Sequence, residues 1–273
     1  LHRLIRRQRQ MCIRDRRREA NDLHIVMAEY GEPKPVWISE MGWSTGTKAI
    51  WGVDPKERPR MALQAYAILV GEGLADKFFW YNFHKKGNNP YESTYNLGLI
   101  EHQTASVTPF AAQDEYVMFT AMNKLIGLAD PAEYIRRGDE TMLYHFKRYD
   151  GDDVILAWAE DSAKTVGMRL GCTTLEKFDL YGNKLGTLTS RDGVFALSAE
   201  VQPVYYKGKF SSFEESDMSL SFSDGGGEAG LGEAFTFAVA DAGGRELRIE
   251  ADTELEVVRN QGGELTMRAP GDR

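Results

Sequence analysis

Two short apolar stretches, each followed by a polar loop and an amphipathic run, constrain the fold of this chain more than any other feature. Residues 32–40 (EPKPVWISE) and 76–84 (DKFFWYNFH) lack apolar–polar alternation, which is typical of strands covered on both faces. After each stretch, apolar side chains at helical spacing predict a helix, over residues 55–73 and 108–127. Strand, loop and helix in this order predict parallel α/β units.

The pattern changes after residue 127. Short apolar stretches separated by turn signals such as YDGDD, YGNK and SRDG predict an all-β sandwich. We therefore expect an α/β part over residues 20–127 and a β-sandwich over residues 128–209, with Trp158 in the sandwich core. Residues 210–273 are rich in glycine and acidic side chains, and they are expected to be either a partial second sandwich or an acidic tail.

Residues 1–19 differ from the rest because arginine dominates them. The string RQRQMCIRDR resembles translated sequencing-adapter DNA, so we expect this tract to be non-native or disordered and exclude it from the fold prediction. The alternative is a nucleic-acid-binding arm, which would bind DNA in a salt-sensitive way. The whole chain carries a net charge of −8 even with these arginines, and this acidic balance argues against a nucleic-acid partner.

Composition also narrows the other partners. No apolar run reaches the roughly 18 residues that a membrane span needs, so we expect no membrane partner. The five histidines do not stand at the spacing of metal ligands, so we expect no metal and no cofactor.

Glu40 ends the first predicted strand. In parallel sheets the chemistry collects at the carboxyl ends of the strands, so a carboxylate at this position can face a cleft. By strand alternation Val36, Ile38 and Glu40 share one face, which would place Glu40 at the mouth of the core that the other two enter. The alternative is a glutamate held in a structural salt bridge, and position alone does not separate the two.

Aromatic and polar side chains gather at the ends of the same two stretches. Trp80 lies near the end of the second strand and shares a face with Asn82. Such residues beside a carboxylate suit sugars, because the C–H face of a pyranose stacks on a ring while its hydroxyls form hydrogen bonds. The further candidates for sugar binding are Trp43, Trp51, Tyr81 and His84. Packing in the core is the alternative use of such rings, and we expect it for Trp37, Phe78, Phe79 and Phe83.

Three segments carry a family resemblance. KPVWISEMGWST resembles the seventh barrel strand of the clan A glycoside hydrolases, which are (β/α)8 retaining enzymes, and DKFFWYNFHKKGNN…YNLGLIE resembles their eighth strand. Residues 108–127 are similar to their closing helix, and residues 128–209 to the small sandwich that many of them carry. The resemblance implies α/β plus all-β architecture: the last two βα units of an incomplete TIM barrel, followed by an antiparallel β-sandwich.

The same resemblance implies a function. Glu40 would be the catalytic nucleophile, Trp80 the platform at the subsite where cleavage occurs, and the substrate an oligo- or polysaccharide with β-glycosidic bonds. In the family the acid/base follows an asparagine on the fourth strand, and this chain has no Asn-Glu pair. Of the nearby carboxylates, none is assigned as the acid: Glu29, Glu32, Glu92 and Glu101.

A full barrel takes about 250 residues, so we expect a C-terminal fragment that is inactive by itself. The sequence leaves the location of the parent enzyme open, with secretion or the periplasm as options. Two alternatives remain: a transglycosidase built on the same nucleophile, and a non-catalytic carbohydrate-binding module or scaffold protein.

Overall fold

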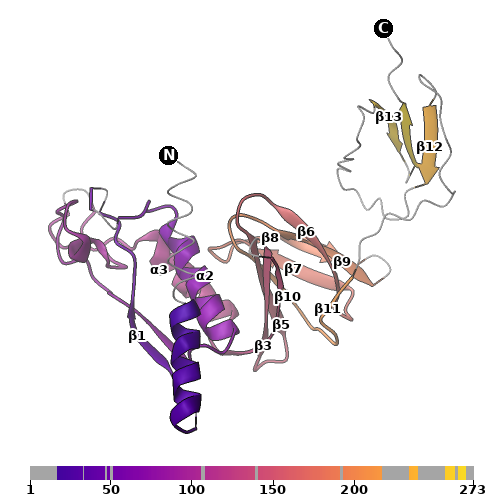
Figure 1. The fold of residues 1–273 in the computed structure, drawn as a ribbon. Helices are drawn as coiled ribbons and strands as arrows, with labels where there is room; N and C mark the ends of the chain where they lie inside the picture. The colour runs from indigo at the N-terminus through magenta and orange to yellow at the C-terminus, as the bar shows by residue number, and fades with distance from the viewer. Residues whose placement is uncertain are drawn as a thin grey trace.

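The structure is a computed structural model. It describes residues 17–32, 34–46, 48–49, 52–105, 108–138, 141–190 and 193–216, and three further strands between residues 234 and 268 (Figure 1). Trp51, the basic tract up to residue 16 and most of residues 210–273 lie outside the described residues.

The α/β part contains a two-stranded parallel sheet and helices in the predicted order. Its elements are a helix over residues 17–30, β1 (Trp37–Met41), α2 (Arg58–Gly71), β2 (Lys77–Trp80), the short 3-10 helix η1 (Ser93–Asn96) and α3 (Asp114–Leu125). β1 and β2 run parallel, and α2 lies between them in the chain. The predicted strands and helices are therefore confirmed, although α2 and α3 are shorter than the ranges 55–73 and 108–127 that the sequence pattern indicated.

Local sequence explains where these helices begin and end. Pro59 stands in the first turn of α2, where its missing N–H removes no helical hydrogen bond. Gly73 follows the helix with a φ of +68°, a left-handed conformation that glycine adopts without steric cost. In α3, Asp114 and Glu115 lie in the first turn and Lys124 in the last, so their charges complement the helix dipole.

The end of β1 contains an irregularity that strand alternation did not predict. Ile38 pairs with Phe78, but the next pair is Met41 with Trp80, so β1 has one residue more than β2 between these pairs. Met41 is buried in the same apolar cluster as Ile38, whereas Glu40 is exposed. A bulge shifts the alternation by one residue, so Met41 continues the buried face of Ile38, while Glu40 still lines the cavity that Val36 and Ile38 enter.

The described residues cover only one face of the β1–β2 sheet. Three of the aromatic residues expected in its core are exposed instead: Trp37 at 57%, Phe79 at 46% and Phe83 at 60%. Phe78 is half-buried against the cluster that α2 shares with β1. The prediction of core packing was wrong for Trp37 and Phe79 because their strand positions point away from α2, and the two rings contact each other at 6.1 Å instead.

The predicted all-β part is confirmed as antiparallel sheets. The large sheet has the order β3 (Ala129–Arg137), β4 (Thr141–Arg148), β5 (Asp153–Ala159), β10 (Val204–Gly208), β7 (Thr174–Phe178) and β8 (Lys184–Thr189). The small sheet has the order β11 (Glu214–Glu215), β6 (Lys164–Arg169) and β9 (Val194–Ala199). A third sheet has the order β12 (Ala234–Ala238), β14 (Glu264–Arg268) and β13 (Glu256–Gln261).

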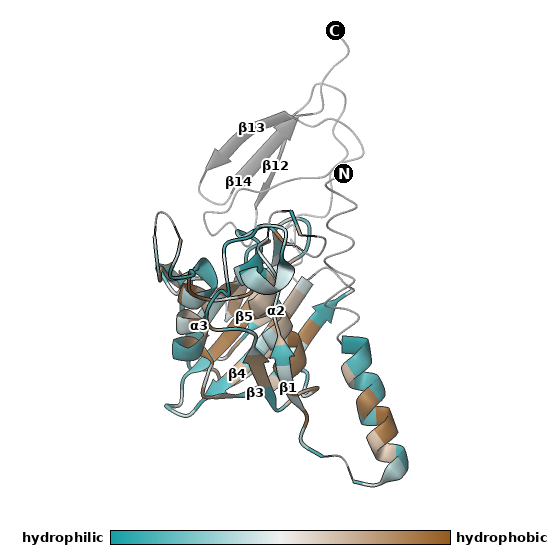
Figure 2. Ribbon diagram, turned by 90° about the vertical axis from the view of Figure 1, so that its left-hand side faces the viewer, coloured by the Kyte–Doolittle hydropathy of each residue, from teal (hydrophilic) through white to brown (hydrophobic). Residues whose placement is uncertain are grey.

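The central strands β4 and β5 of the large sheet are buried on both faces, because the sheet takes part in two cores. Along β5, Ile155 and Ala157 point to the small sheet, where they pack with side chains of β6 and β9. Leu156 and Trp158 point the other way and pack with side chains of α2 and α3. This alternation is that of an ordinary strand, and it joins the α/β part and the sandwich in one apolar layer. In Figure 2 β5 is largely brown, in keeping with its apolar sequence.

Among the helices of the described residues, none combines the length and apolar character that crossing a membrane requires.

Candidate active site

Glu40 and Trp80 lie at the same edge of the parallel sheet. Glu40 is next to the last residue of β1, and Trp80 is the last residue of β2. Since the strands are parallel neighbours, their carboxyl ends meet at one edge, where α/β proteins place their ligands. Both residues that the sequence singled out therefore lie at the predicted edge.

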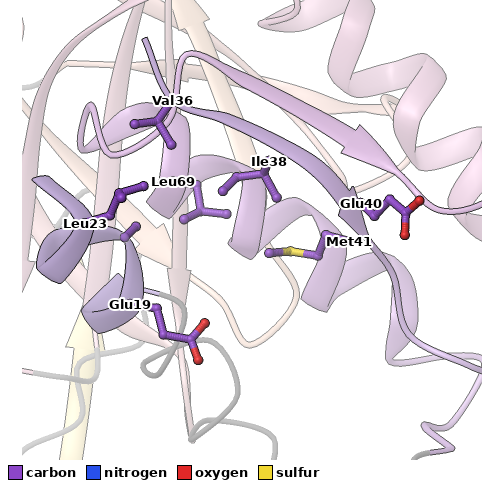
Figure 3. Close-up of a pocket in the computed structure, with 8 residues that line it drawn as sticks. Glu19, Leu23, Val36, Ile38, Glu40, Met41 and Leu69 are labelled. Carbon is purple, nitrogen blue, oxygen red and sulfur yellow. The ribbon is translucent and has the colours of Figure 1, made fainter. Parts of the chain in front are cut away.

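The carboxylate of Glu40 is separate from the apolar side chains behind it. Figure 3 shows the carboxylate extending away from Ile38, Met41 and Leu69, which gather beside α2. These apolar side chains line a cavity of about 190 Å³ between β1, α2 and the helix over residues 17–30, and Glu40 stands at its rim. The bulge thus leaves the carboxylate exposed, which is a common use of bulges at the rims of sheets and beside active sites.

Trp43 and Trp80 form an aromatic pair at this edge. Their ring centroids are 5.9 Å apart and the rings are tilted by 42°. Trp80 also packs edge-on against Phe119 of α3 at 5.3 Å, and its Nε1–H donates to the carbonyl of Leu97 at 3.2 Å. Both tryptophans are half-buried. The packing fixes the orientation of each ring, and the exposed part of each can contact a ligand.

Lys86 is a residue at this edge that the sequence reasoning missed. Its Nζ donates to the hydroxyl of Tyr81 at 2.5 Å and lies 5.1 Å from the Tyr81 ring. The hydrogen bond from Lys86 to Tyr81 and the negative charge of Glu40 raise the pKa of Lys86. The lysine is therefore a cation near Glu40 over the whole neutral range. The pair of lysines directly after the second predicted strand is the sequence signal that could have identified it.

Asn82 and His84 present polar atoms that no described residue satisfies. The Oδ1 atom of Asn82 and the Nε2 atom of His84 are buried and have no hydrogen-bond partner. The His84 ring lies 5.7 Å from His102 and 5.8 Å from Phe110. Buried polar atoms of this kind usually have a partner, so these two lack the one expected of them, and neither atom has exposed surface. The described residues contain no group of three or more side chains able to hold a metal ion.

Gly42 allows the two strand ends to approach each other. The backbone N–H of Tyr81 donates to the carbonyl of Met41 at 2.9 Å, and a Cβ on Gly42 would lie 2.1 Å from the carbonyl oxygen of Tyr81. No side chain fits that distance. The glycine after the Glu-Met pair is therefore a requirement of the contact between the β1 and β2 loops.

Gly42→Ala is expected to lower the free energy of unfolding by about 1–3 kcal/mol, because the added methyl group forces the two loops apart. The matched control is Gly186→Ala, since a Cβ on Gly186 meets nothing within 4 Å. Urea unfolding followed by tryptophan fluorescence measures both. Equal midpoints for the two variants would contradict the contact described here.

A buried arginine lies beneath the tryptophan pair and was not predicted. Arg58, the first residue of α2, is 0% exposed and forms an ion pair with Glu115 of α3, which is 1% exposed. The Nε of Arg58 lies 2.5 Å from Oε1 of Glu115. Only the packing of α3 over α2 brings the carboxylate to it.

The other carboxylates have different surroundings. Glu101 accepts hydrogen bonds from Nζ of Lys85 at 2.7 Å and from Nε2 of Gln113 at 2.9 Å. Glu92 is exposed and precedes η1. Glu29 and Glu32 are exposed and precede the amino end of β1. Glu101 is thus held in an ion pair, and the other three carboxylates stand in no arrangement that supports a catalytic role.

No family model matches the chain, and no curated protein matches it. Among solved structures, a family 39 glycoside hydrolase from the gut symbiont Bacteroides cellulosilyticus has a TM-score of 0.56 and 20% identity, and the match covers 68% of this chain and 37% of that one. Over the matched residues the fold of this chain is similar to that of the corresponding part of that enzyme. The chain spans well under half the length of that enzyme.

Two further matches are weaker. The GH30 xylanase C from Talaromyces cellulolyticus has a TM-score of 0.46 and 13% identity, over 65% of this chain and 41% of that one. The GH30 endoxylanase from Clostridium papyrosolvens has a TM-score of 0.44 and 10% identity, over 64% and 42%.

Proposed function

We propose that this chain carries the nucleophile side of the active site of a retaining glycoside hydrolase, which cleaves β-glycosidic bonds by double displacement. The observation that carries the proposal is the placement of Glu40 and Trp80 at the carboxyl ends of two neighbouring parallel strands. On this proposal β1, α2, β2 and α3 are the last two units of a (β/α)8 barrel, and residues 128–209 are the sandwich that follows it.

Glu40 has the properties that the first chemical step requires. In a retaining mechanism an ionised carboxylate attacks the anomeric carbon and forms a glycosyl ester, which water then hydrolyses. Glu40 is exposed at the end of a strand that is packed on α2, so the carboxylate can reach a sugar while its backbone stays fixed.

The aromatic pair and its neighbours would hold the sugar. One sugar face would stack on the exposed part of Trp80 or Trp43. Ring hydroxyls would exchange hydrogen bonds with the polar side chains of Asn82, His84 and Tyr81. Together these contacts would position the anomeric carbon over the Glu40 carboxylate.

We assign no residue of this chain as the second carboxylate of the mechanism. A retaining enzyme needs an acid about 5–5.5 Å from the nucleophile to protonate the leaving oxygen. The ion pair of Glu101 with Lys85 argues against Glu101 in that role. We therefore propose that the acid/base is supplied by a part of the barrel that this chain does not contain, and that the chain alone does not turn over natural glycosides.

Covalent trapping tests the proposal without the missing acid. A dinitrophenyl β-glycoside with fluorine in place of the hydroxyl beside the anomeric carbon has a leaving group that departs without protonation, and its glycosyl ester is long-lived. The chain is expected to form one ester, on the peptide that contains Glu40, and mass spectrometry of the digest locates it. A chain that gains no label, or gains it elsewhere, contradicts the proposal.

Two variants control this experiment. Glu40→Gln is expected to lose the label entirely, because an amide is not a nucleophile at this carbon. Glu101→Gln changes another partly exposed glutamate that follows β2 and is expected to be labelled like the unchanged chain. Labelling of Glu40→Gln at the wild-type level would remove Glu40 from the mechanism.

A carbohydrate-binding protein without catalysis is the second candidate. The exposed parts of the paired Trp43 and Trp80 rings favour it, since binding needs no second carboxylate. Retardation of the chain by soluble xylan or β-glucan in a native gel, together with no covalent label at Glu40, would support this candidate over the enzyme.

A further inference from the structure

Arg58 is a charged side chain with no surface exposed to solvent. A guanidinium costs several kcal/mol to bury unless it is paired and its donors are used, and Arg58 is 0% exposed. Glu115 supplies the counter-charge, with Nη2 of Arg58 lying 2.5 Å from Oε2 of Glu115. This pair alone would explain a link between α2 and α3.

Three further N–H groups of Arg58 donate to backbone carbonyls, whereas its Nε is ion-paired with Glu115 but has no hydrogen-bond partner. Nη1 donates to the carbonyls of Trp43 at 3.3 Å and Asn96 at 3.1 Å, and Nη2 donates to the carbonyl of Gly98 at 3.1 Å. Trp43 follows β1, whereas Asn96 and Gly98 lie in the long segment after β2. One side chain therefore joins the two loops that carry the candidate sugar-binding residues.

The segment that Arg58 holds also holds Trp80. Leu97 lies between the two carbonyls bound by Arg58, and its own carbonyl accepts the indole N–H of Trp80. The guanidinium carbon lies 6.0 Å from the Trp80 ring, within reach of a cation–π contact. A Cβ on Gly98 would lie 2.0 Å from the backbone nitrogen of Lys85, so the segment is packed closely against the chain that follows β2.

We propose that Arg58 is a positioning residue that sets the placement of the Trp43 ring relative to the Trp80 ring. It acts on Trp43 through the backbone carbonyl of that residue. It acts on Trp80 through its own contact with the ring and through the segment whose Leu97 carbonyl accepts the indole N–H. Glu115 fixes the orientation of the guanidinium. The consequence for sugar binding rests on the proposed function, but the placement itself can be tested without a sugar.

The circular dichroism of the two rings is a direct readout. Two indoles at this distance and tilt couple their electronic transitions and give a paired band, which the difference between the unchanged chain and Trp43→Phe isolates. Arg58→Met is expected to lose this band. Arg58→Lys keeps the charge and its attraction to Glu115 but cannot reach three carbonyls at once, so it is expected to keep the fold and still lose the band.

Arg148→Met is the matched control. Arg148 donates to the carbonyls of Lys124 and Leu125 at the end of α3, so its loss weakens α3 at the opposite end from Glu115 without touching either tryptophan. It is expected to lower the thermal midpoint and leave the paired band unchanged.

The outcomes separate the proposals. A folded Arg58→Met or Arg58→Lys chain with the wild-type band overturns the positioning role, and so does loss of the band in Arg148→Met. If Arg58→Met does not fold, Arg58→Lys decides. Loss of the band in the Arg58 variants with no glycan binding by the unchanged chain would refute the proposed function and leave the role of Arg58 standing.

Discussion

Trp158→Ala is expected to lower the free energy of unfolding by about 3–5 kcal/mol, the usual cost of removing a large buried aromatic side chain. Trp158 is 0% exposed and stacks on Tyr144 with ring centroids 5.2 Å apart and planes inclined by 13°. It lies in the layer that the large sheet shares with α2 and α3, so alanine leaves a cavity in a closely packed region.

The control for this variant is Tyr149→Ala, since Tyr149 is 77% exposed and a surface change of this kind alters stability by about 0.5 kcal/mol or less. Urea unfolding should be followed by fluorescence and by far-ultraviolet circular dichroism together. Because the core crosses from the helices into the sandwich, we expect both signals of Trp158→Ala to shift by the same amount. Separate transitions would mean that the two parts unfold independently.

Trp80→Ala is expected to weaken glycan binding by about ten- to hundredfold. A ring that covers a sugar face contributes about 1.5–3 kcal/mol through apolar contact, and every 1.4 kcal/mol is a factor of about ten in affinity. Affinity electrophoresis in soluble xylan and β-glucan measures the change. Binding at the wild-type level by Trp80→Ala would remove this ring from the site.

Trp80→Phe separates stacking from support. Phenylalanine keeps an apolar face for the sugar but cannot donate to the carbonyl of Leu97, so we expect it to recover most of the affinity that alanine loses. Trp80 also packs on Phe119, so either variant can lower the melting temperature. The melting temperature of each is therefore measured first, and binding is compared well below it. Equal affinity loss in the alanine and phenylalanine variants would show that the hydrogen bond, and not the ring face, is what matters.

The position of the candidate site could be read from the sequence because it depends on local features. An apolar strand that ends in Glu40 and a second with Trp80 near its end, each followed by a helix, predict parallel units with both residues at one edge. The structure has this order. Gly42 was part of the quoted motif, but the need for glycine there depends on the neighbouring strand. A Cβ at this position would lie 2.1 Å from the carbonyl oxygen of Tyr81.

Three features depended on residues far apart in the chain. The bulge that directs Glu40 away from the apolar cluster arises from the pairing of Met41 with Trp80, and alternation within one strand cannot show it. The exposure of Trp37 and Phe79 depends on which face α2 covers. The burial of Arg58 requires Glu115, fifty-seven positions later, to arrive on α3.

The sequence by itself determined the order of the elements, the change from α/β to all-β structure and the strand ends at which Glu40 and Trp80 stand, because spacing of apolar side chains and turn residues acts over a few positions. Only the tertiary structure decided which side chains are buried, how Glu40 is oriented and what supports the tryptophan pair. Those properties follow from contacts between segments, and the free energy of burying a ring or pairing a charge is set by the neighbours that the fold supplies.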